Sequence, residues 1–337
     1  MLFIDIFLFF IYFLTDEYGL LGVAYSQLIQ AVFLLVGSFI LVAKEFKSLL
    51  LLKSNWDLKI FKEVTGFGLK FQFISILVLL FDPITKALLS KFGGLSFLGY
   101  YEMANKLIYQ VRAIIINANQ VMIPVIVHTK FIGEERLNDL YIKNLNLTFI
   151  LSLLLMSSLL ILTPLISVVW IGQLNNDFIY CMIFLSIAVF INILNSTAYF
   201  ASIAHGDLGI LVKSHLLMSA LNIILSSCFG YFYGGKIIVI TSSISLVISS
   251  LYLVVYYHIK NEIKKSLLIT RKNLFLLITS IILVYLAFQF KESLMAIKAN
   301  LYLILIPFFY LIILFIIHSL IVYKEFIKNQ TPQNENN

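Results

Sequence analysis

Long apolar segments, separated by short polar ones, run from one end of the chain to the other. Most have about twenty residues or more, which is the length that an α-helix needs to cross the hydrocarbon core of a bilayer. A transmembrane β-barrel would instead alternate apolar and polar positions over about ten residues. The pattern predicts an all-α polytopic membrane protein with about ten transmembrane helices, at residues 1–14, 20–43, 66–90, 98–127, 145–169, 178–203, 210–232, 236–258, 273–290 and 300–322.

The composition agrees with this fold class. Of the 337 residues, 61% are apolar and 12% are charged, whereas about 25% charged residues are usual in soluble proteins. Both cysteines, Cys181 and Cys228, lie inside predicted spans, so neither a disulfide framework nor a metal site is predicted. The sequence has no phosphate-binding glycine loop and no catalytic Ser/His or Cys/His arrangement. We therefore expect neither an enzyme nor a bound cofactor.

The net charge of +7 follows the predicted topology. When alternate loops are assigned to opposite sides of the membrane, sixteen of the 24 basic residues fall on one side and four on the other. Lysine and arginine concentrate in cytoplasmic loops, so the first side is predicted to be cytoplasmic, together with both termini. The basic loops are thus a topology signal, and no nucleic-acid partner is predicted.

Residues 19–29 resemble residues 235–245, because each segment begins with a glycine at a turn and shares an apolar frame. Glycine turns before apolar helices can resemble one another by chance. An internal repeat, which is common in transporters, is the alternative. It would make spans three to eight one six-helix unit. The predicted division is 1–44, the last two helices of an incomplete N-terminal lobe; 45–65, a cytoplasmic linker; 66–258, a six-helix C-terminal lobe; 259–323, a terminal helix pair; and 324–337, a cytoplasmic tail.

Two neighbouring spans, 66–90 and 98–127, contain charged residues. A charge inside the hydrocarbon costs about 2.5–3.5 kcal/mol on insertion scales, so such residues usually face a bundle interior or a water-filled cavity. Basic residues outnumber acidic ones in these spans, which predicts a polar conduit with a cationic wall. The charged residues are Lys70, Asp82, Lys86, Glu102, Lys106 and Arg112.

The span 98–127 is strongly amphipathic. Its polar residues from Glu102 to Gln120 fall in one half of the helix circumference, which predicts one face on water and one on lipid or protein. A helix lying on the membrane surface is an alternative. Glu102 and Lys106 could neutralise each other at i,i+4 spacing, but Arg112 has no local acidic partner. We therefore expect Arg112 to face the cavity.

Two other spans carry weaker signals. Asp82 precedes Pro83, which can hinge a helix, and its carboxylate could titrate or bind a cation. Asp82 and Lys86 could equally neutralise each other at i,i+4 spacing. In the span 210–232, small and polar residues share one face, and helix packing is the default interpretation. These residues are His215, Ser219, Asn222 and Ser226.

Several short motifs resemble a known family. They are 66–68 (Gly-Phe-Gly), Asp82, 98–107 with its Gly-Tyr-Tyr-x-x-Ala-x-Lys-Leu pattern, Pro124, and 170–172 (Trp-Ile-Gly). Together they resemble the polysaccharide repeat-unit flippases (Wzx-like) of the MATE/MOP exporter superfamily. This resemblance implies a two-lobe transporter fold. Family members usually have fourteen helices, and the ten predicted here would match helices five to fourteen, so the first four helices would be absent.

The resemblance also implies a function. Such a protein moves a polyprenyl-diphosphate-linked oligosaccharide from the cytoplasmic to the outer leaflet of the bacterial cytoplasmic (inner) membrane by alternating access, for O-antigen, capsule or another surface polysaccharide. Expected partners are this lipid-linked oligosaccharide and membrane lipid, and they could include the polysaccharide polymerase machinery.

Roles for individual residues follow from that implied substrate. Cations would bind the diphosphate, and neutral polar groups would bind sugar hydroxyls. Proton or sodium coupling would take place at Asp82 or Glu102. The implied substrate-binding residues are Arg112, Lys106, Lys86, Asn105, Tyr109 and Asn119.

Three other functions remain open. A multidrug or cation antiporter of the same superfamily would be expected to have a net acidic cavity, and here the two spans are net basic. An integral-membrane polysaccharide polymerase or ligase would need a large external loop, whereas every predicted external loop is shorter than about a dozen residues. An inactive remnant of a transporter is the third.

Overall fold

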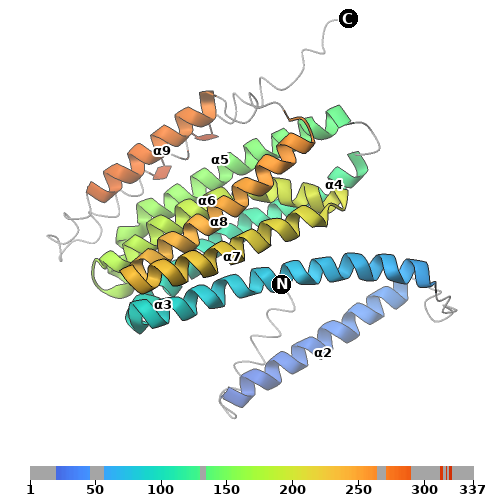
Figure 1. Cartoon of the computed structure of the whole chain (residues 1–337), viewed down its shortest axis with the longest axis horizontal. Helices are drawn as coiled ribbons and strands as arrows, with labels where there is room; N and C mark the ends of the chain where they lie inside the picture. The colour runs from blue at the N-terminus through green and yellow to red at the C-terminus, as the bar shows by residue number, and fades with distance from the viewer. Residues whose placement is uncertain are drawn as a thin grey trace, which may run out of the picture. The chain divides into compact units, whose positions relative to one another are not determined.

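The computed structural model describes residues 20–45, 57–129, 134–263 and 271–289, together with residues 312, 313, 316, 319 and 320. All regular structure in this part of the chain is helical, which confirms the all-α prediction (Figure 1). The elements are α2 (Leu20–Glu45), α3 (Leu58–Gln120), α4 (Met122–Thr129), α5 (Glu134–Ile166), the π-helical turn η2 (Ser167–Ile171), α6 (Asn176–His205), α7 (Leu208–Tyr233), α8 (Gly235–Lys260) and α9 (Arg271–Gln289).

The chain divides into two compact units, Met1–Val64 and Thr65–Asn337. The first contains α2 and the beginning of α3. The second contains the rest of α3 and the helices from α4 to α9, and all the predicted site residues belong to it. Within the second unit, α5 packs on α6, α6 on α8 and α8 on α7, while α9 lies against α5 (Figure 1).

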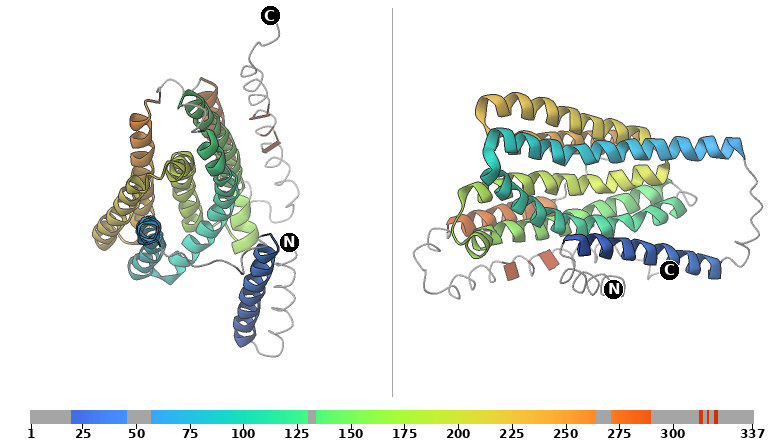
Figure 2. Two further views of the ribbon diagram at one scale, coloured as in Figure 1. Left: turned by 90° about the vertical axis from the view of Figure 1, so that its right-hand side faces the viewer. Right: turned by 90° about the horizontal axis from the view of Figure 1, so that it is seen from below.

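The helix α3 folds back on itself at Gly94. This residue has non-helical backbone angles (φ 80°, ψ 165°), and a positive φ of this kind favours glycine. The side chains of Lys86 and Glu102 meet at 2.7 Å, although a straight helix would separate these positions by about 24 Å. Figure 2 shows that the chain reverses direction there. We call residues 58–93 the first arm and residues 95–120 the second arm.

The break at Gly94 agrees with the predicted spans. Pro83, which the sequence offered as a place where a helix can hinge, lies within helical backbone, and Gly94 is the non-helical residue of α3. A proline removes one helix hydrogen bond without having to stop the helix. Gly94 instead lies in the short segment that was predicted to be an external loop, so the two arms correspond to the predicted spans 66–90 and 98–127.

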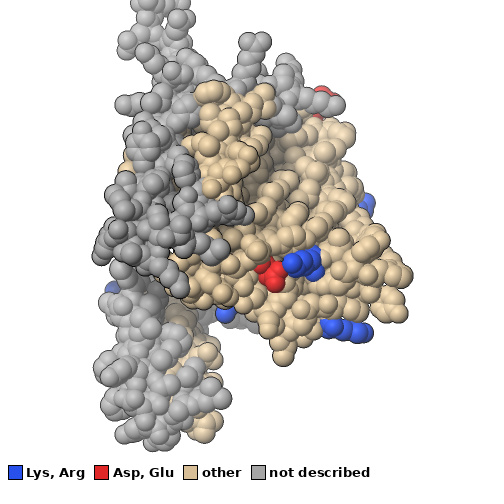
Figure 3. All heavy atoms as spheres, turned by 90° about the vertical axis from the view of Figure 1, so that its left-hand side faces the viewer, with Lys and Arg blue, Asp and Glu red and all other residues tan. Residues whose placement is uncertain are grey.

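Three turns, each at a glycine with positive φ, gather at one end of the second unit: Gly94, Gly172 and Gly234. Here the backbones of Gly93 and Gly235 are in direct contact, since a Cβ on Gly235 would lie 2.4 Å from the Cα of Gly93. Figure 3 views this end, where charged side chains are few among apolar and neutral ones. It is the end that the sequence assigns to the external side.

The described residues contain fewer membrane-spanning segments than the ten that the sequence predicts for the whole chain. In the part of the chain that the structure describes, six helical segments are long and apolar enough to cross a membrane, and the segment 273–289 is a shorter apolar helix. One of the six, Leu58–His128, contains both arms of α3 and therefore two predicted spans. The predicted span 1–14 and most of 300–322 lie outside the described residues.

The second arm buries one apolar stripe, made of Tyr101, Ala104, Ile108 and Ile115, at helical spacing. These side chains are 0–2% exposed and belong to a core that includes residues of α6 and α8. In contrast, Ile114 is 63% exposed. The second arm therefore contacts the bundle on one side and presents apolar side chains outward on another.

The polar row on α7 packs helices together, as predicted. The Ser219 hydroxyl donates to the carbonyl of Leu77 at 3.0 Å, and the Ser226 hydroxyl lies 2.8 Å from that of Thr241 on α8. The fourth member of the row, His215, makes an edge contact with the ring of Tyr199 on α6. The packing interpretation of this row is confirmed.

Candidate functional site

The predicted site residues all lie on the two arms of α3. Asp82 and Lys86 are on the first arm, and the others are on the second: Glu102, Asn105, Lys106, Tyr109, Arg112 and Asn119. Because the arms fold together at Gly94, the structure brings some of these residues into contact and separates others.

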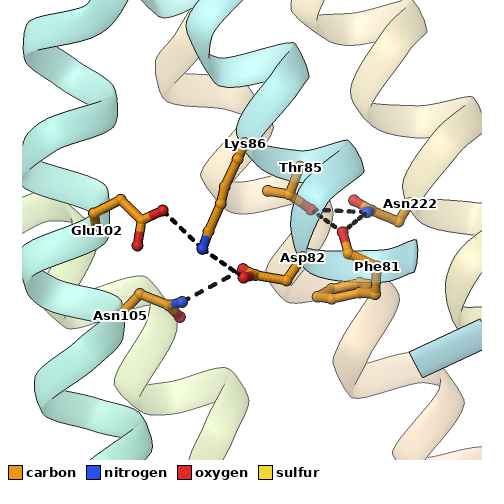
Figure 4. Close-up of polar contacts among 7 residues, drawn as sticks. All are labelled: Phe81, Asp82, Thr85, Lys86, Glu102, Asn105 and Asn222. Atoms are coloured by element: carbon orange, nitrogen blue, oxygen red, sulfur yellow. Dashed lines mark hydrogen bonds and ion pairs between the residues drawn. The ribbon is translucent and has the colours of Figure 1, made fainter. Parts of the chain in front are cut away.

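Lys86 bridges two carboxylates, one from each arm (Figure 4). Its Nζ lies 2.6 Å from Oδ2 of Asp82 and 2.7 Å from Oε1 of Glu102, and Nδ2 of Asn105 donates to Oδ1 of Asp82 at 3.4 Å. The three charged side chains are 30–40% exposed. We call Asp82, Lys86 and Glu102 the triad; its formal charge is −1.

The sequence allowed two i,i+4 ion pairs, Asp82 with Lys86 and Glu102 with Lys106, and the structure contains one of them. The i,i+4 pair of Asp82 and Lys86 is present. Glu102, however, pairs across the hairpin with Lys86 and not with Lys106, which makes no ion pair within the described residues. The positive charge of Lys86 is therefore fully committed to protein carboxylates.

An asparagine on α7 supports the backbone beside Asp82 (Figure 4). Nδ2 of Asn222 lies 3.3 Å from the carbonyl oxygen of Phe81 and 2.8 Å from Oγ1 of Thr85, and Thr85 itself donates to the Phe81 carbonyl at 2.9 Å. Buried polar groups satisfied in this way hold their helices in one arrangement. The helical turn that carries Asp82 is thus held in place by hydrogen bonds from α7.

Arg112 has entirely different partners. Its Nε donates to Oδ1 of Asn192 on α6 at 3.1 Å, and Nδ2 of Asn192 donates to Oγ of Ser250 on α8 at 3.0 Å. The ring of Tyr109 lies against the guanidinium, with 5.4 Å between Cζ and the ring centroid. Arg112 has no acidic partner in the part of the chain that the structure describes. We call Arg112, Tyr109, Asn192 and Ser250 the arginine site.

The polar half of the second arm faces several directions. Lys106, Gln110 and Asn117 are exposed. Asn119 is 5% exposed, its Nδ2 donates to Ser196 at 2.7 Å, and its Oδ1 accepts from Thr148 at 3.0 Å. Both ends of its amide are engaged, so Asn119 joins the second arm to α5 and α6 and is not open to a ligand in this structure.

The described residues contain no group of three or more histidine, cysteine, aspartate and glutamate side chains that could hold a metal ion. Asp82 and Glu102 are both paired with the ammonium of Lys86, which lies between them. A monovalent cation or proton there would compete with Lys86.

The sequence did not reveal Asn192 and Ser250 as site residues. Asn192 lies 80 positions from Arg112 along the chain, and both residues sit in long apolar spans with other small polar side chains. Nothing in their local sequence distinguishes them from packing residues such as Ser226. The only sequence signal is that an unpartnered arginine needs hydrogen-bond acceptors from neighbouring helices.

Comparisons with known proteins agree with this architecture. A family profile described as "Polysaccharide biosynthesis protein" matches residues 6–180, just over half of the chain. Among solved structures, the lipid II flippase MurJ in its inward closed conformation superposes with a TM-score of 0.63 at 19% identity, covering 97% of this chain and 68% of that one. No curated protein sequence matches the chain significantly. At this identity the structural match shows a shared fold.

Proposed function

Because the chain belongs to the polysaccharide biosynthesis protein family, we propose that it moves a polyprenyl-diphosphate-linked oligosaccharide across the bacterial cytoplasmic membrane. The oligosaccharide would be a repeat unit of O-antigen, capsule or another surface polysaccharide, carried from the cytoplasmic to the outer leaflet. MurJ, a lipid II flippase, has the same fold, which supports this proposal. So does the predicted topology, with both termini in the cytoplasm.

Arg112 is the observation that carries the proposal. A charge in a membrane-spanning helix is costly, by about 2.5–3.5 kcal/mol. Here the neutral partners of Arg112 bind only part of its guanidinium. The hydrogen bond from Arg112 to Asn192 uses Nε, while the guanidinium has four further N–H donors on its two terminal nitrogens. Such a planar fork fits two oxygens of a phosphate at once. Arg112 would therefore bind the diphosphate.

The exposed polar residues of the second arm would line the path of the sugars. Lys106, Gln110 and Asn117 are exposed, and Tyr109 is 37% exposed. Polar side chains at exposed positions of a membrane-spanning helix face water more often than lipid. Amide and phenol groups suit sugar hydroxyls, and Lys106, with no carboxylate partner in the described structure, would add a second cation for the diphosphate.

The triad is the proposed site of ion coupling. It carries one more negative than positive charge, so it attracts a proton or a sodium ion. Neutralising Glu102 would remove the ion pair that joins the two arms, whereas neutralising Asp82 would release Lys86 from its partner on the same arm. Alternating access would then follow as one lobe rocks against the other.

The test is a leaflet assay with the purified 337-residue chain in liposomes. The probe is a polyprenyl diphosphate carrying a fluorescent oligosaccharide, and a membrane-impermeant reductant bleaches the probe in the outer leaflet only. Without translocation about half of the probe is protected; with wild-type protein we expect nearly all of it to be bleached. Arg112→Ala should leave about half protected, as in protein-free liposomes.

Lys70→Ala is the matched control, because Lys70 is an exposed cation at the beginning of the same unit and should behave like wild type. Equal activity of wild type and Arg112→Ala would overturn the proposal. Export of a lipophilic cation by the same liposomes, with no movement of the diphosphate probe, would favour the cation antiporter.

A further inference from the structure

The guanidinium of Arg112 is held on one edge and one face. Nε bonds Asn192 at 3.1 Å, and the Tyr109 ring lies 5.4 Å from Cζ. Because a guanidinium is planar and rigid, these two contacts together fix the direction of its two terminal amino groups. The arginine is thus oriented before any ligand arrives.

Asn192 is itself fixed. Its Nδ2 donates to Ser250 at 3.0 Å, and Ser250 is 1% exposed within the spanning helix α8. An amide can present either its oxygen or its nitrogen, and a donor such as Nε–H requires the oxygen. The bond to Ser250 uses the nitrogen, so the oxygen faces Arg112. The chain of contacts therefore joins α3, α6 and α8.

We propose that Asn192 is a positioning residue for anion binding: its neutral oxygen orients the guanidinium of Arg112 without neutralising it, and Ser250 fixes the amide. The terminal amino groups are then left for the oxygens of a phosphate or diphosphate group. This inference rests on the proposed function, since it takes Arg112 as the residue that binds the anion.

The neutrality of residue 192 is the specific requirement. Aspartate has nearly the same shape as asparagine and would make a stronger, charge-assisted bond to Arg112. It would also cancel the positive charge and repel an incoming anion. Lys86 is an example of a cation whose charge is neutralised in this way, since it pairs with two carboxylates.

The experiment measures binding of farnesyl diphosphate to the full chain in lipid nanodiscs by titration calorimetry, together with thermal unfolding. We expect Asn192→Asp to weaken binding at least about 100-fold while leaving the melting temperature equal or higher. Asn192→Ala should weaken binding about tenfold, because it removes the orienting bond and keeps the charge. Ser250→Ala should weaken binding about threefold.

Asn176→Asp is the control, because it makes the same chemical change at the exposed beginning of α6; its binding should equal that of wild type. A purely structural role for Asn192 predicts that aspartate is tolerated better than alanine. Binding by Asn192→Asp that equals or exceeds that of Asn192→Ala would overturn the inference.

Arg112→Ala separates this inference from the proposed function. If Arg112→Ala loses binding and Asn192→Asp keeps it, only the positioning role is wrong. If Arg112→Ala binds as tightly as wild type, Arg112 does not hold the anion, and the proposed function and the positioning role both fail.

Discussion

Lys86 and Arg112 lie on the two arms of one helical hairpin, and the sequence offered both as cations for the same ligand. The structure separates them. Lys86 contacts two carboxylates at 2.6 and 2.7 Å, so the triad has a net charge of −1. Arg112 contacts an amide and an aromatic ring, so the arginine site keeps its charge of +1. A cation is available to a ligand only where the surrounding fold has not already neutralised it.

This difference has an energetic side as well. Two unit charges at 4 Å interact by about 4 kcal/mol at an effective dielectric constant of 20. Ion pairing therefore stabilises the contact between the arms at the triad. The arginine site has no ion pair among the described residues and lacks this stabilisation. A cation that is paired with carboxylates, such as Lys86, should therefore matter most for stability. A cation with neutral partners, such as Arg112, should matter most for binding.

Lys86→Met is expected to have the largest effect on stability. It leaves Asp82 and Glu102 facing each other, which should lower the free energy of unfolding by about 2 kcal/mol. This is less than the cost of about 3–5 kcal/mol for a fully buried pair, because the side chains are 30–40% exposed and solvent screens them. Thermal unfolding in detergent measures the loss.

Two further variants check the interpretation of Lys86→Met. Adding Glu102→Gln to it removes one of the facing carboxylates and should restore about half of the loss. Arg112→Met should change stability by less than about 1 kcal/mol, since no charged partner is left behind. Equal destabilisation by Lys86→Met and Arg112→Met would show that the two cations do not differ in the proposed way.

Arg112→Lys should weaken binding of farnesyl diphosphate about tenfold. A lysine keeps the charge but has neither the Nε–H that bonds Asn192 nor the planar fork that grips two oxygens. The reciprocal change, Lys86→Arg, should alter binding less than about threefold, because a guanidinium can also serve two carboxylates. Calorimetric titration of both variants gives the comparison. A similar change in both would mean that charge alone decides binding.

The sequence predicted which segments of the second unit are helical, because hydropathy and turn residues act locally. The span predicted at 178–203 is the helix Asn176–His205, and the turn predicted before 236 lies at Gly234. The reversal at Gly94 lies in the segment that was predicted as a loop, although the helix continues closer to Gly94 on both sides than the predicted spans 66–90 and 98–127 do. Local patterns thus give the element but not always its ends, since α5 begins at Glu134 and the predicted span began at 145, where the apolar run starts.

The site was less predictable, because its contacts depend on packing between distant segments. Glu102 and Lys106 have the right spacing for an ion pair, yet the fold brings Lys86 to Glu102 instead. Asn119 shares the polar half of the second arm with Arg112, yet it packs between helices. A helical projection predicts the face of the helix on which a residue lies, but it does not predict which other segment packs against that face.

Glu102→Gln should change binding less than Arg112→Lys does and in the opposite direction, which distinguishes the triad from the arginine site. The substitution brings the triad from −1 to neutral and frees Lys86 from one partner, so an anion nearby meets less repulsion. We expect farnesyl diphosphate to bind about fivefold more tightly. Asp177→Asn is the matched control, because Asp177 pairs with Lys236 at 2.7 Å near the turns, and it should leave binding unchanged. Weaker binding by Glu102→Gln would mean that the carboxylate serves the ligand directly, and the triad would then belong to the same binding surface as Arg112.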